Sequence, residues 1–253
     1  QGTDAALAFA FGHVILREFH LDNPSEYFTD YCRQYSDMPM LVRLDPREDG
    51  SYVTSRYLRA SDLDGALGEA NNPEWKTLAF DENSGGLVVP HGSVGFRWGE
   101  KGRWNIEERD SQGRDTRLVL SLKDGHDGFV NVCFPYFGGV AHESWTSSPR
   151  EDILKRHIPT RKIMQADGTE VLVASVYDLQ LAQYGLDRGF GGEHVASSFD
   201  DDVPGTPAWQ ERITGVPRAE VIEIAREFAR AADKARGRSM IIVGAAMNHW
   251  YHN

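Results

Sequence analysis

The sequence predicts an α/β fold, and three features of the 253-residue chain carry that prediction. Apolar residues recur at helical spacing in two segments, one near the beginning at 4–19 and one near the end at 218–235. The run 240–243, which follows the second of these helices, is apolar on both faces, as in a strand buried in a parallel sheet. Between them, residues 45–145 lose helical periodicity and are punctuated by Gly, Pro, Asn and Asp, which predicts a β-rich region.

The first helix is predicted to run from about Asp4 to Phe19, with Thr3 or Asp4 as its N-cap. Its residues are apolar nearly all round, and such a helix is normally buried inside a larger body. The N–H groups of its first turn, just after Gly2 and Thr3, could meet a phosphate or the polar edge of a ring. Plain N-capping explains the same residues and is the more common case.

A second helix is expected next, with Asn23 as its cap, Pro24 in its first turn and Glu26 three residues after the cap. Its aromatic face is interpreted as packing surface rather than as a base-stacking platform, because no basic residues are interleaved with it. That face consists of Tyr27, Phe28, Tyr31 and Tyr35. The run 40–44, closed by an Asp-Pro pair, is predicted to be a strand.

The β-rich region contains five predicted strands and two predicted turns. The strands are 75–80, 86–90, 94–98, 117–122 and 130–134, and the turns are 83–86 and 101–102. A short helical turn is expected at 151–156. Beyond it, an Ala-Asp-Gly turn at 166–168 predicts a hairpin of 160–165 with 169–174, and residues 176–184 are expected to be helical.

The stretch 185–207 is rich in glycine and acidic residues and is interpreted as an exposed loop. The adjacent carboxylates of Asp200, Asp201 and Asp202 are a possible cation site, but neighbouring side chains can point apart, so exposure to solvent is favoured. Pro217 is expected to begin the helix at 218–235, and Gly237 is placed to cap its end.

Composition and charge exclude several classes of function. The net charge is −11 and the chain has no Lys/Arg-rich run, which argues against a nucleic-acid partner. No apolar run reaches the roughly 20 residues that span a bilayer. Cys32 and Cys133 stand far apart without a metal-ligand pattern, so both are expected to be ordinary thiols. The chain starts without a methionine and stops in the middle of a loop, so both ends are expected to be truncated.

The loop after the last predicted strand is the first place to look for a site, because ligands of open α/β sheets bind beyond the carboxyl ends of strands. Small residues from Gly244 onward would let a ligand approach the backbone, and Asn248, His249 and His252 add polar groups. The chain has no HExxH, GxSxG, Walker or GxGxxG motif. From these patterns alone, only a ligand-binding α/β segment is predicted.

Longer strings resemble a known family. QGTDAALA at 1–8, MLVRL at 40–44, TGVP at 214–217 and GAAMNH at 244–249 resemble, in this order, the large molybdopterin oxidoreductases. More narrowly, the chain is similar to the α subunits of membrane-bound respiratory nitrate reductases. That similarity rests on HLDNP at 20–24, GFRWGEKG at 95–102, FPYFGG at 134–139, DLQLAQYG at 178–185 and the run 244–252, and it extends over the whole length.

The resemblance implies a catalytic subunit that reduces nitrate to nitrite by oxygen-atom transfer at a molybdenum bis(molybdopterin guanine dinucleotide) centre, with an iron–sulfur cluster nearby. The implied partners are an iron–sulfur beta subunit and a haem-containing membrane gamma subunit that oxidises quinol. They would hold the enzyme at the cytoplasmic face of the bacterial membrane. In this family the ligands of the metal and the cluster lie upstream of Gln1. No metal ligand and no catalytic residue is therefore assigned here, and the chain alone is expected to be inactive.

The resemblance also implies two groups of cofactor-binding residues. One group would meet the guanine end of one cofactor, and the other would reach towards the pterin and the metal. They are Gly2, Thr3 and Asp4 for the first group, and Gly244, Met247, Asn248 and His249 for the second. His252 stands where related enzymes commonly have a small residue, so no role is assigned to it.

In domain terms, 1–44 is expected to close one α/β cofactor-binding domain of the molybdopterin-oxidoreductase type. Residues 45–150 would form a β-rich insertion, and 151–253 would open a second, truncated α/β cofactor-binding domain. Two alternatives stay open: a related molybdenum enzyme that reduces selenate or chlorate, and a non-catalytic α/β interaction module.

Overall fold

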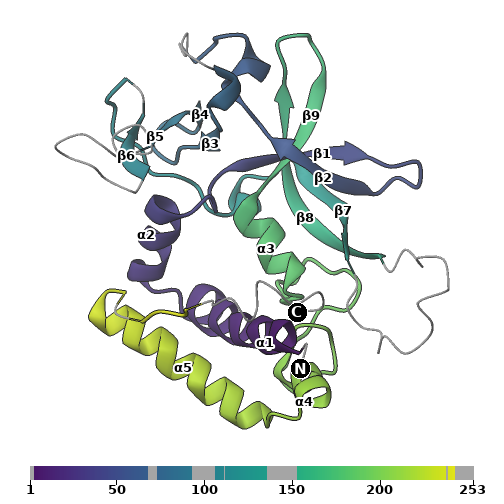
Figure 1. Cartoon of the computed structure of the whole chain (residues 1–253). Coiled ribbons are helices and arrows are strands. Elements are labelled where there is room, and N and C mark those ends of the chain that lie inside the picture. Colours follow the sequence, from purple (N-terminus) through teal and green to yellow (C-terminus); the bar gives the residue numbers. More distant parts are fainter. Residues whose placement is uncertain are drawn as a thin grey trace. The chain divides into compact units, whose positions relative to one another are not determined.

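A computed structural model of the chain describes residues 3–67, 73–92, 106–110, 112–135, 153–237 and 239–242. The chain divides into two compact units, and each is assembled from separate segments. The helical unit comprises Gln1–Thr29, Phe134–Leu154 and Leu181–Asn253, and the barrel unit comprises Asp30–Cys133 and Lys155–Gln180. The division predicted from the sequence, at 44/45 and 150/151, concerns domains of a whole protein and stays a prediction. Helices and strands together confirm the α/β class (Figure 1).

The barrel unit is built on five strands that close into a barrel in the order β1-β2-β7-β8-β9 (Figure 1). They are β1 (Leu41–Pro46), β2 (Tyr52–Tyr57), β7 (Gly128–Pro135), β8 (Ile153–Met164) and β9 (Glu170–Ser175). β1 pairs antiparallel with β2 and β9, β8 pairs antiparallel with β9, and β2 pairs in parallel with β7. This arrangement confirms the predicted strands at 40–44 and 130–134 and the predicted hairpin at 160–174.

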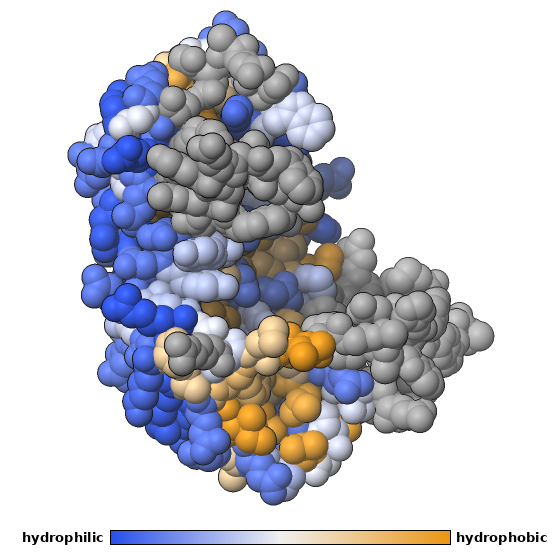
Figure 2. All heavy atoms as spheres, turned by 60° about the vertical axis from the view of Figure 1, so that its left-hand side comes forward, coloured by the Kyte–Doolittle hydropathy of each residue, from blue (hydrophilic) through white to orange (hydrophobic). Residues whose placement is uncertain are grey.

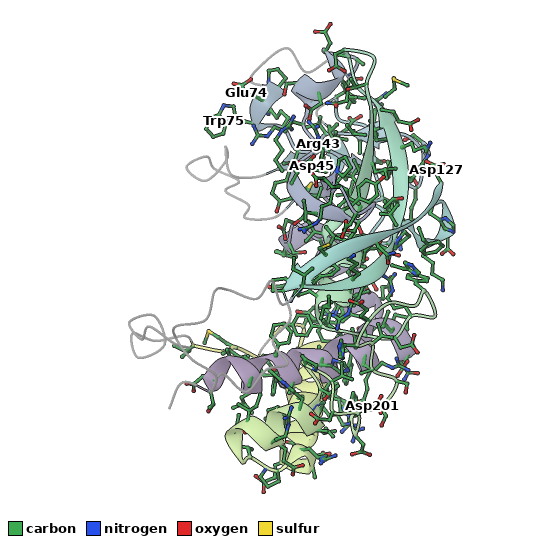
Figure 3. The ribbon with its side chains drawn as sticks, turned by 90° about the vertical axis from the view of Figure 1, so that its right-hand side faces the viewer. Arg43, Asp45, Glu74, Trp75, Asp127 and Asp201 are labelled. Carbon is green, nitrogen blue, oxygen red and sulfur yellow. The ribbon has the colours of Figure 1, made fainter. Side chains whose placement is uncertain are left out.

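Two small sheets accompany the barrel: β3 (Ala79–Phe80) with β4 (Leu87–Val88), and β5 (Pro90–Gly92) with β6 (Ile106–Asp110). The strand predicted at 75–80 is therefore shorter than expected, because Pro73–Trp75 forms a 3₁₀ turn. The side chain of Trp75 in this turn is 80% exposed and points away from the barrel unit (Figure 3). The core of the unit is a cluster of buried apolar side chains that includes Leu41, Leu58, Leu78, Phe80, Leu122, Ile163 and Val173.

The strand predicted at 117–122 is wrong, and a buried carboxylate explains why. Leu118 makes only an isolated bridge to Asp81, and Leu122–Asp124 forms a 3₁₀ turn. Asp178, which is 0% exposed, accepts hydrogen bonds from Leu122 N–H (2.7 Å) and from the hydroxyls of Ser121 (2.7 Å) and Ser175 (2.9 Å). These bonds take the backbone at 121–122 out of any strand ladder. Asp178 lies in the first turn of α3 (Val176–Gln183). This helix confirms the one predicted at 176–184.

The helical unit is organised around α1 (Asp4–Leu16), which packs on α4 (Pro207–Thr214) and α5 (Arg218–Ala235) (Figure 1). α5 confirms the predicted helix at 218–235, with Pro217 before it and Gly237 (φ 86°) after it. α4 was not predicted, although its signals are local. Thr206 caps it by accepting a hydrogen bond from Trp209 N–H, and Gly215 ends it at φ 75°.

The first two helices differ from their predictions in detail. α1 ends at Leu16, and Arg17–Asp22 continue it as a π-helix. α2 (Glu26–Tyr35) is capped by Ser25, whose Oγ accepts from Phe28 N–H, so the prediction of Asn23 as the cap is wrong. On α2, Tyr31 and Tyr35 stack with ring centroids 4.9 Å apart and remain 47% and 54% exposed. Neither side chain is therefore part of a core in the described part of the chain, and packing of this face against another domain stays a prediction.

Two further predictions, the helical turn at 151–156 and the buried strand at 240–243, are wrong for the residues that the structure describes. The expected helical turn at 151–156 is replaced from Ile153 onward by β8. Residues 240–242 form no strand and are not buried, since Met240, Ile241 and Ile242 are 77%, 63% and 81% exposed. Figure 2 shows apolar side chains gathered over one face of the helical unit. The predicted segments 94–98 and 101–102 lie outside the described residues.

Candidate functional site

The N-terminus of α1 carries the two predicted site residues that the structure describes. Thr3 occupies the N-cap position (φ −120°, ψ 5°), but its side chain makes no capping hydrogen bond. Its carbonyl oxygen accepts a hydrogen bond from Leu7 N–H at 3.3 Å. Asp4 follows in the first turn and is exposed. The first-turn N–H groups are thus not satisfied by the hydroxyl of the cap residue, and an exposed carboxylate stands beside them.

Packing against Tyr184 fixes the position of α1. The rings of Phe9 and Tyr184 stack with centroids 4.4 Å apart, and the Nδ1 atom of His13 lies 2.9 Å from the Tyr184 carbonyl oxygen. Gly12 permits this approach, because a Cβ at that position would lie 2.6 Å from Cε1 of Tyr184. Phe9, Gly12 and His13, which lie on one face of the helix within about one and a half turns, therefore all contact one residue from a distant part of the sequence.

A second set of contacts joins α1 and the π-helix that follows it to α5. Arg226 holds the Glu18 carboxylate with both Nε (2.9 Å) and Nη2 (2.6 Å), and this hydrogen bonding raises the pKa of the arginine. The rings of Phe11 and Phe228 meet edge to face at 5.4 Å. Sites carried on rigid elements are held more accurately than sites on loops, so these contacts matter for the geometry at Thr3 and Asp4.

A cavity of about 240 Å³ lies beside the π-helix, and sequence reasoning missed it. Its lining includes His13, Arg17 and Asp22. Arg17 donates from Nε to Asp22 Oδ2 at 3.1 Å and from Nη1 to the Asp187 carbonyl at 3.0 Å. Because these charged groups are already paired, we interpret the cavity as structural. A π-helical turn has no simple sequence signature that could have predicted it.

The acidic run at 200–202 is an exposed loop, as predicted. Asp200 and Asp202 are 79% and 57% exposed and pair with different arginines, Arg218 at 2.9 Å and Arg212 at 3.1 Å. Asp201 (Figure 3) accepts backbone N–H bonds from 198 and 197, which lower the pKa of its carboxyl group. The three carboxylates thus serve separate contacts. Within the described ranges, no group of three or more His, Cys, Asp or Glu side chains is placed to hold a metal ion.

The two cysteines behave as expected for ordinary thiols. Neither forms a disulfide. Burial raises the pKa of the Cys32 thiol to about 11, so this group stays protonated near neutral pH. The half-buried Cys133 places its Sγ 3.2 Å from the hydroxyl of Ser51.

His20, in the π-helix, is expected to make the helical unit sensitive to acid. Burial lowers the pKa of its imidazole from 6.5 to about 4. The unfolded chain therefore takes up a proton between pH 6.5 and 4 that the folded chain does not, and stability falls as the pH drops through this window. We expect His20→Gln to flatten that loss, measured by hydrogen exchange of the α1 amides at several pH values. An unchanged pH profile would contradict this assignment.

The second group of predicted site residues cannot be placed beside the first. Gly2 lies outside the described residues, as do Gly244, Met247, Asn248, His249 and His252. The contacts predicted for the two groups, to the guanine end of one cofactor and towards the pterin and the metal, therefore stay predictions. No helix in the described part of the chain is both long and apolar enough for a membrane span.

Comparison with known proteins finds relatives that match the chain along nearly its whole length. No family model matches the chain. It is 58% identical over 253 residues to the respiratory nitrate reductase 1 alpha chain of Escherichia coli K12, covering 100% of this chain and 20% of that protein. It is 45% identical to the respiratory nitrate reductase alpha chain of a Bradyrhizobium species, covering 97% and 23%. It is 25% identical to the perchlorate reductase subunit alpha of Dechloromonas aromatica, covering 100% and 20%. The chain thus spans about a fifth of the length of these curated relatives.

Proposed function

We propose that this chain, which belongs to the family of respiratory nitrate reductase alpha chains, is part of a catalytic subunit that reduces nitrate to nitrite. The observation that carries the proposal is 58% identity along the entire chain to such a protein. The perchlorate reductase subunit, at 25% identity, supports the alternative of another oxyanion much less strongly.

The cofactor in this proposal is molybdenum held by two molybdopterin guanine dinucleotides, which supplies two-electron oxygen-atom transfer when bound. The residues at the start of α1 fit the nucleotide end of such a group. The Thr3 hydroxyl leaves the first-turn N–H groups uncapped, and the Asp4 carboxylate is exposed. A guanine base presents a ring N–H and an amino group side by side, and one carboxylate can accept both hydrogen bonds.

The remaining assignments follow from the family. Gly2, Gly244, Met247, Asn248 and His249 are proposed to complete the contacts to the pterin nucleotides. Asn248 can both donate to and accept from a pterin edge, and His249 can donate to an oxygen atom. An iron–sulfur beta subunit and a haem-containing gamma subunit are proposed to deliver electrons at the cytoplasmic face of the membrane.

Asp4→Ala in the full-length enzyme is expected to lower the molybdenum and guanine nucleotide content of the purified protein. The reason is that the two guanine donors would lose their common acceptor. Molybdenum is measured by elemental analysis and the nucleotide by release and chromatography. Asp202→Ala, which removes an exposed carboxylate elsewhere in the helical unit, is the matched control. Wild-type contents in both variants would refute the role of Asp4.

The substrate is tested separately, on the intact full-length enzyme. Turnover with nitrate, chlorate, perchlorate and selenate is compared as kcat/KM, and nitrate is expected to give the highest value. A higher value for another oxyanion would favour the alternative and would leave the proposed guanine contact at Asp4 unaffected.

A further inference from the structure

The barrel unit contains a second cavity that the proposed cofactor contacts do not use. Its volume is about 340 Å³, which is within the range of small-ligand pockets. Apolar side chains of Phe80, Val119 and Leu122 form part of its wall, and Arg161 and Asp124 add charged groups. A cavity with an apolar wall and a few polar groups suits a ligand that has an apolar part and a charged end.

Arg161 is the unusual member of this lining. Its guanidinium carbon lies 4.0 Å from the centroid of the Phe80 ring, and its Nε is buried without a hydrogen-bond partner. The described part of the chain offers it no carboxylate, whereas Arg33 and Arg226 each donate to a glutamate, at 3.0 and 2.6 Å. Stacking on a ring holds the guanidinium plane but supplies no hydrogen-bond acceptor.

Two acidic residues in the wall do not fill this role, because their charge is used elsewhere. The Asp81 carboxylate accepts hydrogen bonds from the backbone N–H groups of Ser84 (2.9 Å) and Arg117 (2.7 Å) and from the Ser84 hydroxyl (2.7 Å). Glu82 accepts from Arg33 and Arg117, each at 3.0 Å. Arg161 is therefore the cation of this cavity that still lacks an anion among the described residues.

We propose that this cavity binds a carboxylate on a short apolar stem. The acid group would lie against the guanidinium of Arg161, and the stem would lie along Val119 and Leu122. A planar guanidinium can bind the two oxygens of a carboxylate with parallel N–H bonds, and burial of the stem favours such acids over inorganic anions. The group can come from a free small acid or from an acidic side chain of another polypeptide.

A substitution at Asp124 should change the affinity for the carboxylate in the opposite direction from a substitution at Arg161. Asp124 is exposed, lines the same cavity and forms no ion pair with a described residue. Its negative charge opposes a bound carboxylate, so Asp124→Asn should strengthen binding while Arg161→Gln abolishes it.

The experiment uses phenylglyoxal, which modifies arginines whose guanidinium is accessible to solvent, including those in weak surface ion pairs. The full-length alpha chain is treated with and without n-butyrate, and modification of Arg161 and Arg109 is followed by peptide mass spectrometry. At twice its dissociation constant, butyrate should slow modification of Arg161 about threefold by mass action. Arg109, which is 62% exposed and pairs with Asp115, serves as the internal control and should not change. n-Butylamine and inorganic phosphate should protect Arg161 much less.

The same measurement on the assembled enzyme distinguishes the two sources of the acid. Protection of Arg161 without added butyrate indicates an acidic side chain of another polypeptide. Reactivity that butyrate still suppresses indicates a free small acid. If butyrate has no effect on Arg161, or if phosphate protects equally well, the proposal fails. It also fails if Arg161 is unreactive in the full-length alpha chain alone, because the guanidinium would then already be paired.

Hydrogen exchange provides a second readout that does not require a reactive arginine. Butyrate should slow exchange of the amides at 119–125 in the wild-type chain and in Arg109→Gln, but not in Arg161→Gln. Asp124→Asn should show the same slowing at a lower butyrate concentration. Slowing in Arg161→Gln equal to that in the wild type would overturn the assignment of Arg161.

Discussion

Asp178→Ala is expected to lower the free energy of unfolding of the barrel unit by about 3–5 kcal/mol, because it leaves several buried donors without their acceptor. The carboxylate is fully buried and accepts from Ser121, Leu122 and Ser175 at 2.7–2.9 Å. Each buried donor that loses its partner costs about 1–3 kcal/mol. The two hydroxyls can rotate towards other acceptors, but the N–H of Leu122 is fixed in the backbone.

The change is measured by native-state hydrogen exchange of the amides of β8 and β9 in the full-length protein. Asp178→Asn retains one acceptor oxygen and should lose less stability than Asp178→Ala. Asp115→Ala removes a carboxylate that is 85% exposed and should change the opening free energy by less than about 0.5 kcal/mol. Equal effects of Asp178→Ala and Asp115→Ala would show that burial of this carboxylate is not important for the barrel.

The Asp178 cluster also illustrates what could not be predicted from the sequence. The run 117–122 has the alternation of a strand, but a carboxylate from residue 178 redirects its backbone. This is a long-range effect, and no local pattern reports it. The hairpin at 160–174 and the helix at 218–235 were predictable, because their turn, periodicity and capping signals all lie within the segment itself.

The same distinction applies to the strand predicted at 240–243. Its composition favours burial between neighbouring strands, but burial needs those neighbours. Among the described residues no strand pairs with 240–242, and the three side chains remain more than half exposed. Composition therefore indicates the environment for which a segment is suited, whereas the fold determines whether that environment is present.

The candidate site was predictable in part. Thr3 and Asp4 stand at a helix N-terminus, as capping preferences indicate. The means by which that helix is held were not predictable. Tyr184 contacts α1 although it lies 171 positions after His13 in the sequence. Gly12, which makes room for the Tyr184 ring, cannot be distinguished in the sequence from any other helical glycine. The pairing of Gly12 with Tyr184 became visible only in the structure.

Tyr184→Ala is expected to destabilise the helical unit by about 2–4 kcal/mol, because it removes a ring packed against α1 and leaves a cavity. The ring stacks on Phe9 at 4.4 Å and lies over Gly12. The hydrogen bond from His13 goes to the backbone carbonyl of Tyr184 and should survive. Hydrogen exchange of the α1 amides measures the loss, and Tyr184→Phe, which keeps the stacked ring, is the control. If the helix positions Asp4, Tyr184→Ala should also retain less molybdenum than the wild type in the full-length enzyme.

Gly12→Ala tests this packing in the opposite direction. In the wild-type chain the new Cβ would lie 2.6 Å from the Tyr184 ring, and we expect a net loss of about 1–2 kcal/mol from the displaced ring. In the Tyr184→Ala background the clash is absent, and alanine is favoured over glycine in a helix by up to about 1 kcal/mol. The substitution should therefore change from destabilising to stabilising, and the double-mutant cycle should show strong coupling. Additive effects of the two substitutions would mean that Tyr184 does not rest on this turn of α1, and the argument that it fixes the helix, and with it Asp4, would no longer hold.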